Sequence, residues 1–278
     1  MRDGAAGGAR RDDMPARVKT ARRFIVGANW KCHGRTTSAR AYAKALGDAA
    51  LPRDVDVYIA PSLLHLHALR DGMPEELEVA AQNFWDGGDG AYTGETSGDM
   101  LREAGATRVI VGHSERRTLF GETDDDVRMK ACRALEDGLS VSLCVGENAG
   151  VRSEGGAVEF CIKQLEAVMP YVPESKWRDV VVVYEPLWAI GTGIAAEPKK
   201  VQEMHAAIRD WFAARTSVAR AAKMRITYGG SVNEQNCQSL AQLEDVDGFL
   251  VGNASLSASS FIGICQGSSV AARKCAAA

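Results

Sequence analysis

The sequence predicts a single catalytic domain of the α/β class, a closed (β/α)₈ barrel over residues 21–270. After residue 24, eight short apolar or β-branched runs alternate with amphipathic stretches, and one run, VVVVY at 180–184, is apolar throughout. Strands that alternate with helices pair in parallel, and parallel strands covered on both faces are apolar along their length. Eight such units in about 250 residues suit a closed barrel, whereas a doubly wound open sheet usually has fewer strands.

The individual elements follow from local patterns. The predicted strands are 24–29, 55–60, 77–81, 108–112, 140–146, 180–185, 225–230 and 248–252, and the predicted helices between them include 38–49, 124–137, 158–169 and 198–214. The last helix opens at Glu197-Pro198, where a proline loses no hydrogen bond. Gly138 can end the helix before the fifth strand in a left-handed conformation.

Composition narrows the function classes. The 278 residues are 46% hydrophobic and 25% charged, as in globular proteins, and no run of eighteen apolar residues could span a membrane. A net charge of −3 argues against a nucleic-acid partner. Seven cysteines show no C-x-x-C spacing and leave an odd one over, so we expect neither a zinc site nor a disulfide framework, but a reducing, cytoplasmic compartment.

The two ends of the chain are expected to lie outside the barrel. Residues 1–20 are rich in Gly, Ala and Arg and have few large apolar groups, which predicts a disordered extension. An organellar targeting segment is the alternative, although its early aspartates disfavour it. Residues 271–278 are interpreted as a C-terminal tail.

Polar residues gather where the predicted strands end, which is where (β/α)₈ barrels carry their chemistry. Taken singly, each has an ordinary structural explanation, such as a solvated lysine or a hydrogen-bonded core histidine. Their convergence on one rim predicts an active site. The residues are Asn29, Lys31, Gln82, Asn83, His113, Ser114, Glu115, Glu147, Glu185, Ser231, Gly252 and Asn253.

Two glycine-containing loops indicate a phosphate site. YGGSV follows the seventh strand and VGNAS follows the eighth, and backbone amides of these two loops cradle phosphate in many such barrels. Between Pro186 and Gly193, PLWAIGTG has an apolar middle and glycines at its end, as expected for a lid that closes over a substrate. GTGIAA at 191–196 lies too far from the strand end to be a dinucleotide-binding turn.

Seven motifs in order, NWK, AQN, GAYTGE, GHSERR, YEPLWAIGTG, YGGSV and DGFLVG, closely resemble those of the triosephosphate isomerase family over about Phe24 to Ile264. The resemblance implies interconversion of dihydroxyacetone phosphate and D-glyceraldehyde 3-phosphate, in glycolysis and gluconeogenesis, without a cofactor or metal. It implies that Glu185 is the catalytic base, His113 the electrophile, and Lys31 a catalytic and substrate-binding cation. Asn29, Gly191, Ser231, Gly252 and Asn253 would complete the substrate site.

The resemblance also implies a homodimer, in which the loop at 84–96 inserts into the partner subunit and Thr93 approaches the partner's active site. Cys32 is expected at that interface. Asn253 replaces a glycine of the family, and we expect it to keep a positive φ, since asparagine tolerates that region best among non-glycine residues. The alternatives are another phosphate-binding barrel enzyme, such as a lyase, and a catalytically inactive binding protein on the same scaffold.

Overall fold

The computed structural model describes residues 22–190 and 196–270, so the expected extension over 1–20 and the tail over 271–278 lie outside the described residues. Eight parallel strands form a closed barrel in sequence order, and β1 pairs with β8 to complete it. The strands are β1 (Phe24–Asn29), β2 (Val55–Ala60), β3 (Glu78–Ala81), β4 (Arg108–Val111), β5 (Ser140–Val145), β6 (Val180–Tyr184), β7 (Arg225–Tyr228) and β8 (Gly248–Val251).

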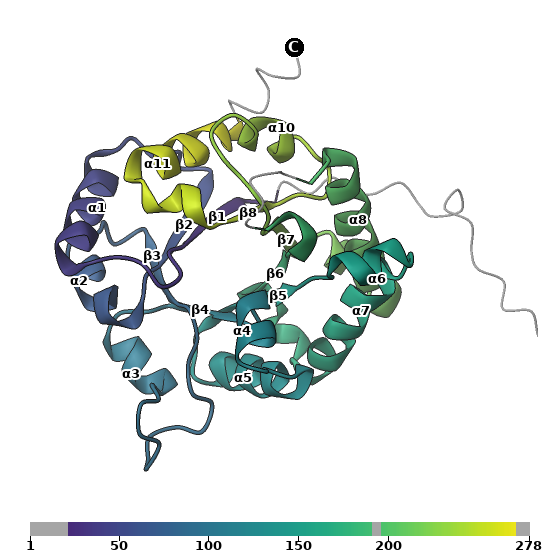
Figure 1. Cartoon of the computed structure of the whole chain (residues 1–278), viewed down its shortest axis with the longest axis horizontal. Coiled ribbons are helices and arrows are strands. Elements are labelled where there is room, and N and C mark those ends of the chain that lie inside the picture. Colours follow the sequence, from purple (N-terminus) through teal and green to yellow (C-terminus); the bar gives the residue numbers. More distant parts are fainter. Residues whose placement is uncertain (1–21, 191–195, 271–278) are drawn as a thin grey trace, which may run out of the picture.

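Helices form a ring around the strands (Figure 1). The α-helices are α1 (Thr36–Asp48), α2 (Leu66–Arg70), α3 (Gly98–Glu103), α4 (Ser114–Leu119), α5 (Asp124–Glu136), α6 (Ala149–Ser153), α7 (Ala157–Val168), α8 (Pro198–Arg215), α9 (Val218–Ala221), α10 (Cys237–Ala241) and α11 (Ala258–Gly267). Short 3₁₀ turns are η2 (Leu63–His65), η3 (Met169–Tyr171), η4 (Glu174–Asp179), η5 (Leu187–Ala189) and η6 (Asn253–Leu256). No helix in these described ranges is long and apolar enough to cross a membrane.

The predicted barrel is confirmed, and each of the eight predicted strands corresponds to an observed one. Several predicted strands ran one or two residues too far, because the chain leaves the sheet where its polar rim begins. Val180 to Tyr184 are all buried, as the apolar run predicted. Gly138 has a φ of 82° after α5, and Pro198 occupies the first turn of α8.

The interior of the barrel is blocked by an aromatic and charged floor. Gly27 leaves the space that the Tyr58 ring fills, since a Cβ there would lie 2.1 Å from that ring. The Tyr58 hydroxyl meets the Ser142 hydroxyl at 3.1 Å, which joins β2 to β5. Arg108 is 2% exposed, lies over the Tyr58 ring and donates to Glu78 at 2.9 Å. A buried guanidinium is tolerable because it is paired in this way.

A second buried charge network lies under β7 and β8. Arg209 of α8 donates to Asp245 and to Asp247, each at 2.6 Å, and Arg22 also pairs with Asp247. His205, one helical turn before Arg209, is fully buried beside the Asp245 carbonyl, 3.1 Å from its Nδ1. Asp247 directly precedes β8, so this network lies at the amino ends of the strands, opposite the polar rim.

Candidate active site

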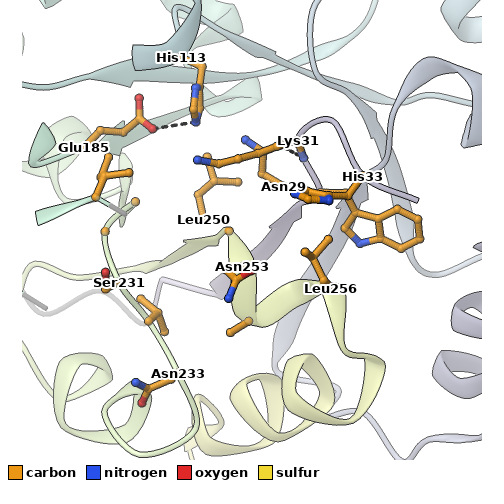
Figure 2. A pocket seen from close by; sticks show the side chains of 17 residues that line it. Asn29, Lys31, His33, His113, Glu185, Ser231, Asn233, Leu250, Asn253 and Leu256 are labelled. Atoms are coloured by element: carbon orange, nitrogen blue, oxygen red, sulfur yellow. Dashed lines mark hydrogen bonds and ion pairs between the residues drawn. The ribbon is translucent and has the colours of Figure 1, made fainter. Parts of the chain in front are cut away.

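Residues from five strand ends (β1, β4, β6, β7 and β8) and the loops after them line one cavity of about 560 Å³ at the carboxyl end of the barrel. Figure 2 shows Glu185 and His113 at one side, Lys31 and Asn29 beside them, and Ser231 and Asn253 at the other end. Five of the predicted site residues in the described chain besides Glu185 and His113 line it: Asn29, Lys31, Ser231, Gly252 and Asn253. Gly191, the remaining predicted site residue, lies outside the described residues.

Glu185 follows β6 directly, and its backbone N–H still donates to the Val145 carbonyl at 2.8 Å. The side chain is buried, with Oε1 3.0 Å from His113 Nε2 and Oε2 accepting from the Ser114 N–H at 2.9 Å. Burial alone would raise the pKa of Glu185, but the His113 contact outweighs it and holds that pKa below its usual value. The carboxylate is therefore held ionised in a dry place.

His113 caps the N-terminus of α4. Its Nδ1 accepts a hydrogen bond from the Glu115 N–H at 3.2 Å, which leaves the ring proton on Nε2, the nitrogen facing Glu185. Burial alone would lower the pKa of His113, but the Glu185 carboxylate outweighs it and raises that pKa above its usual value. The ring is thus fixed as a donor toward the cavity.

Lys31 has a φ of 53°, which makes it the only non-glycine residue of the described chain with a positive φ. As predicted, the first strand ends at Asn29, and the chain turns there, so Lys31 lies outside β1. The Asn29 side chain accepts from the Lys31 N–H at 3.0 Å, and Gln82 donates to the Lys31 carbonyl at 3.0 Å. The Lys31 ammonium pairs with Glu115 at 2.6 Å.

The expected phosphate loops meet at the other end of the cavity. Gly229, Gly230 and Ser231 line it from the β7 side, and the Ser231 hydroxyl donates to the Ala189 carbonyl at 3.1 Å. Gly252 caps η6, whose first N–H groups have no partner within the turn. The predicted positive φ of Asn253 was wrong: Asn253 begins η6, and a 3₁₀ turn requires a negative φ.

Glu147 was predicted as a rim residue but does not line the cavity. It is fully buried, and one oxygen accepts from Tyr184, Trp188 and Arg152 at 3.0, 2.8 and 2.9 Å. Trp188, within the predicted lid, is half-buried, and the Arg152 guanidinium lies over its ring. Of the predicted lid, Gly191 and Gly193 lie outside the described residues.

Comparison with known proteins identifies the fold's family. Residues 24–268 match the model of the triosephosphate isomerase family. The chain belongs to the triosephosphate isomerase family. A chloroplastic triosephosphate isomerase of Secale cereale is 45% identical over 244 residues, which is 88% of this chain and 81% of the relative. A cytosolic triosephosphate isomerase of Stellaria longipes is 45% identical over 258 residues, which is 92% of this chain and 99% of the relative.

A triosephosphate isomerase of Emericella nidulans is 43% identical over 235 residues, which is 84% of this chain and 94% of the relative. Membership of the triosephosphate isomerase family makes the chain an isomerase, and its relatives include chloroplastic and cytosolic proteins. In ranges 22–190 and 196–270, no cluster of three or more His, Cys, Asp or Glu side chains could hold a metal ion. That the reaction needs no metal or cofactor stays a prediction.

Proposed function

We propose that this site interconverts dihydroxyacetone phosphate and D-glyceraldehyde 3-phosphate by moving a proton between neighbouring carbons through an enediolate. The observation that carries the proposal is the Glu185–His113 pair, 3.0 Å apart and buried at the wall of the cavity. A carbon acid beside a carbonyl is weak, so its base must be close and shielded, and the enediolate oxygen must meet fixed donors. This pair offers a base and a donor together.

Glu185 is the proposed base. Its depressed pKa keeps it ionised at neutral pH, and burial leaves few waters to compete for it. A positioned general base supplies about 10²–10⁴-fold in rate. The Ser114 N–H holds the carboxylate at rest, and this bond has to be exchanged for substrate when Glu185 takes the proton.

His113 and Lys31 are the proposed stabilisers of the enediolate. The Nε2–H of His113 can donate to the substrate carbonyl, and Lys31 supplies positive charge across the cavity. The pKa of His113 is raised by the Glu185 charge, so the cause of that rise disappears once Glu185 carries the substrate proton. His113 then donates its Nε2–H to the substrate as a neutral imidazole, without needing a proton on Nδ1.

The phosphate group is proposed to lie between the β7 loop and η6. Ser231, Gly252 and Asn253 line this end, and backbone N–H groups at the start of a helical turn suit an anion. A coupled assay that reports glyceraldehyde 3-phosphate tests the proposal. Rapid turnover of dihydroxyacetone phosphate supports it, and no turnover above the uncatalysed rate by purified protein would overturn it in favour of a binding protein or a lyase.

We further propose that the chain forms a homodimer. The segment between β3 and α3 projects beyond the ring of helices (Figure 1), and its Tyr92 side chain is 46% exposed. Leu64 of η2 is 87% exposed, and Cys32, expected at the interface, is exposed in the single chain. Large exposed apolar patches often mark protein interfaces, and we infer that these side chains belong to one.

Light scattering tests this assembly. A mass of twice the 29.8 kDa chain supports a dimer, and Thr93→Arg should then lower both mass and activity. A wild-type protein that is monomeric and fully active would contradict it.

We also propose that the protein works in a reducing compartment, the cytoplasm being the simplest. Six cysteines of the described chain are free, four of them buried. The location of the chain fused at its C-terminus to a fluorescent protein tests the compartment, and accumulation in a plastid would contradict the cytoplasmic proposal.

A further inference from the structure

One side chain holds the loop that follows β7. The Asn236 amide donates to the Ser231 carbonyl at 3.0 Å, and its oxygen accepts from the Asn233 N–H at 2.8 Å. Ser231 and Asn233 both line the cavity, but Asn236 does not. Asn236 therefore ties two points of the cavity wall together from behind.

The other end of this tie is anchored in the core. Asn236 is the residue before α10, whose Cys237 and Leu240 are buried, and the Cys237 N–H donates to the Asn233 carbonyl at 3.0 Å. The Asn233 side chain accepts from the N–H groups of Gln235 and Asn236, each at 3.0 Å. The segment from Ser231 to Asn236 is thus a closed set of hydrogen bonds fixed to a packed helix.

This anchoring matters because the loop would otherwise be soft. Gly229 and Gly230 precede Ser231, and glycines lose more backbone entropy on ordering than other residues. Holding the Ser231 carbonyl fixes the peptide plane after Ser231, since a trans peptide is rigid. Lys31, the cation of the cavity, is paired with Glu115, so the phosphate end must rely on oriented hydroxyl and N–H donors.

We propose that Asn236 is a positioning residue that preorganises Ser231 for the substrate phosphate. The inference rests on the proposed function and adds to it a residue outside the cavity. It predicts a specific pattern: the affinity for any phosphate-bearing ligand depends on Asn236, whereas chemistry at the Glu185 end does not. A merely structural role in capping α10 would affect both ends alike.

The test compares Asn236→Ala with wild type on three ligands. We expect the KM for dihydroxyacetone phosphate and the inhibition constant of inorganic phosphate to rise by the same factor, about tenfold. The reason is that the variant loses a hydrogen bond that orients Ser231 toward the anion, and one hydrogen bond corresponds to about that factor. The kcat should stay within about twofold, because uniform binding is lost. With D-glyceraldehyde, which lacks the phosphate, kcat/KM should also stay within about twofold.

Two further variants separate positioning from stability. Asn236→Ser keeps an oxygen near the start of α10 but is too short to reach Ser231, so it should show the same loss of phosphate affinity. Ser217→Ala removes a comparable hydrogen bond at the start of a different short helix, from the Arg220 N–H at the start of α9, which precedes β7. This variant should change the constants for none of the three ligands.

The outcomes are distinct. Unchanged constants for both phosphate ligands, or a parallel loss with D-glyceraldehyde, would overturn the inference. If wild type does not turn over dihydroxyacetone phosphate, the proposed function fails. Calorimetric titration of wild type and Asn236→Ala with inorganic phosphate then still decides the role of Asn236: weaker binding by the variant supports it and equal binding overturns it.

Discussion

Replacing Gln82 by methionine should impair the active site without touching a residue that lines it. Lys31 holds a φ of 53°, a region that costs a non-glycine residue on the order of 1 kcal/mol or more. The Gln82 amide donates to the Lys31 carbonyl at 3.0 Å and to the Ala60 carbonyl at 2.9 Å. Gln82 therefore offsets strain at the residue that carries the cavity's positive charge.

The size of the effect follows from what each carbonyl loses. The Ala60 carbonyl keeps a bond from the Trp30 N–H at 3.0 Å, so the loss falls mainly on Lys31. One hydrogen bond contributes about 1–1.5 kcal/mol, and 1.4 kcal/mol is tenfold in an equilibrium. Gln82→Met, similar in volume, should lower kcat/KM for dihydroxyacetone phosphate about tenfold in a coupled assay, because the competent Lys31 conformation is less populated.

Gln202→Met is the matched control. The Gln202 side chain also makes two bonds, to the Asp245 carboxylate at 2.6 Å and from the Asp245 N–H at 3.1 Å, but far from the cavity. It should lose comparable stability and keep its kcat/KM. A Gln82→Met enzyme within twofold of wild type would refute the reasoning.

Three other changes test separate parts of the molecule. Burial lowers the pKa of His205 to about 4, so between pH 6.5 and 4 the unfolded chain binds a proton at this residue and the folded chain does not. The free energy of unfolding should therefore be highest above pH 6.5 and fall by about 3 kcal/mol as the pH is lowered to 4. His205→Phe should remove this slope from urea unfolding, and identical slopes would contradict it. Arg108→Met should lower the free energy of unfolding by about 2 kcal/mol and leave activity unchanged, because Glu78 loses its buried partner. Adding Glu78→Met to this variant should recover part of the lost stability, and a further loss in the double variant would count against this. Asn253→Gly should leave kcat unchanged and slightly lower KM by removing a side chain near the anion; a hundredfold gain, about 2.7 kcal/mol of barrier, would mean that the phosphate end is impaired in the natural chain.

The fold was predictable because its signals are local. The run from Val180 to Tyr184 is apolar because both faces of β6 are covered, and the polar residues that follow mark the rim. This logic also placed Glu185 and His113 in one site, since parallel strands end on the same side of a barrel. The strand pattern alone does not predict that Glu185 and His113 lie in direct contact through their side-chain atoms.

What the sequence did not predict depends on contacts between distant residues. The positive φ of Lys31 is supported by Gln82, 51 positions away, and no local pattern marks it. Glu147 follows a strand like Glu185 does, yet bonds from Tyr184 and Trp188 draw it away from the cavity. Asn253 was expected to behave as the glycine it replaces, but the turn of η6 decides its φ.

The most direct measurement follows the proton that Glu185 is proposed to move. Dihydroxyacetone phosphate is incubated in D₂O with wild type or Glu185→Gln, and deuterium at the reacting carbon of recovered substrate and product is followed by NMR. Wild type should incorporate deuterium in step with turnover. Glu185→Gln, which keeps the shape but not the base, should keep its fold and its inorganic phosphate affinity while losing both exchange and turnover by about a thousandfold or more. A variant that retains most of its exchange would contradict the assignment of Glu185 as the base.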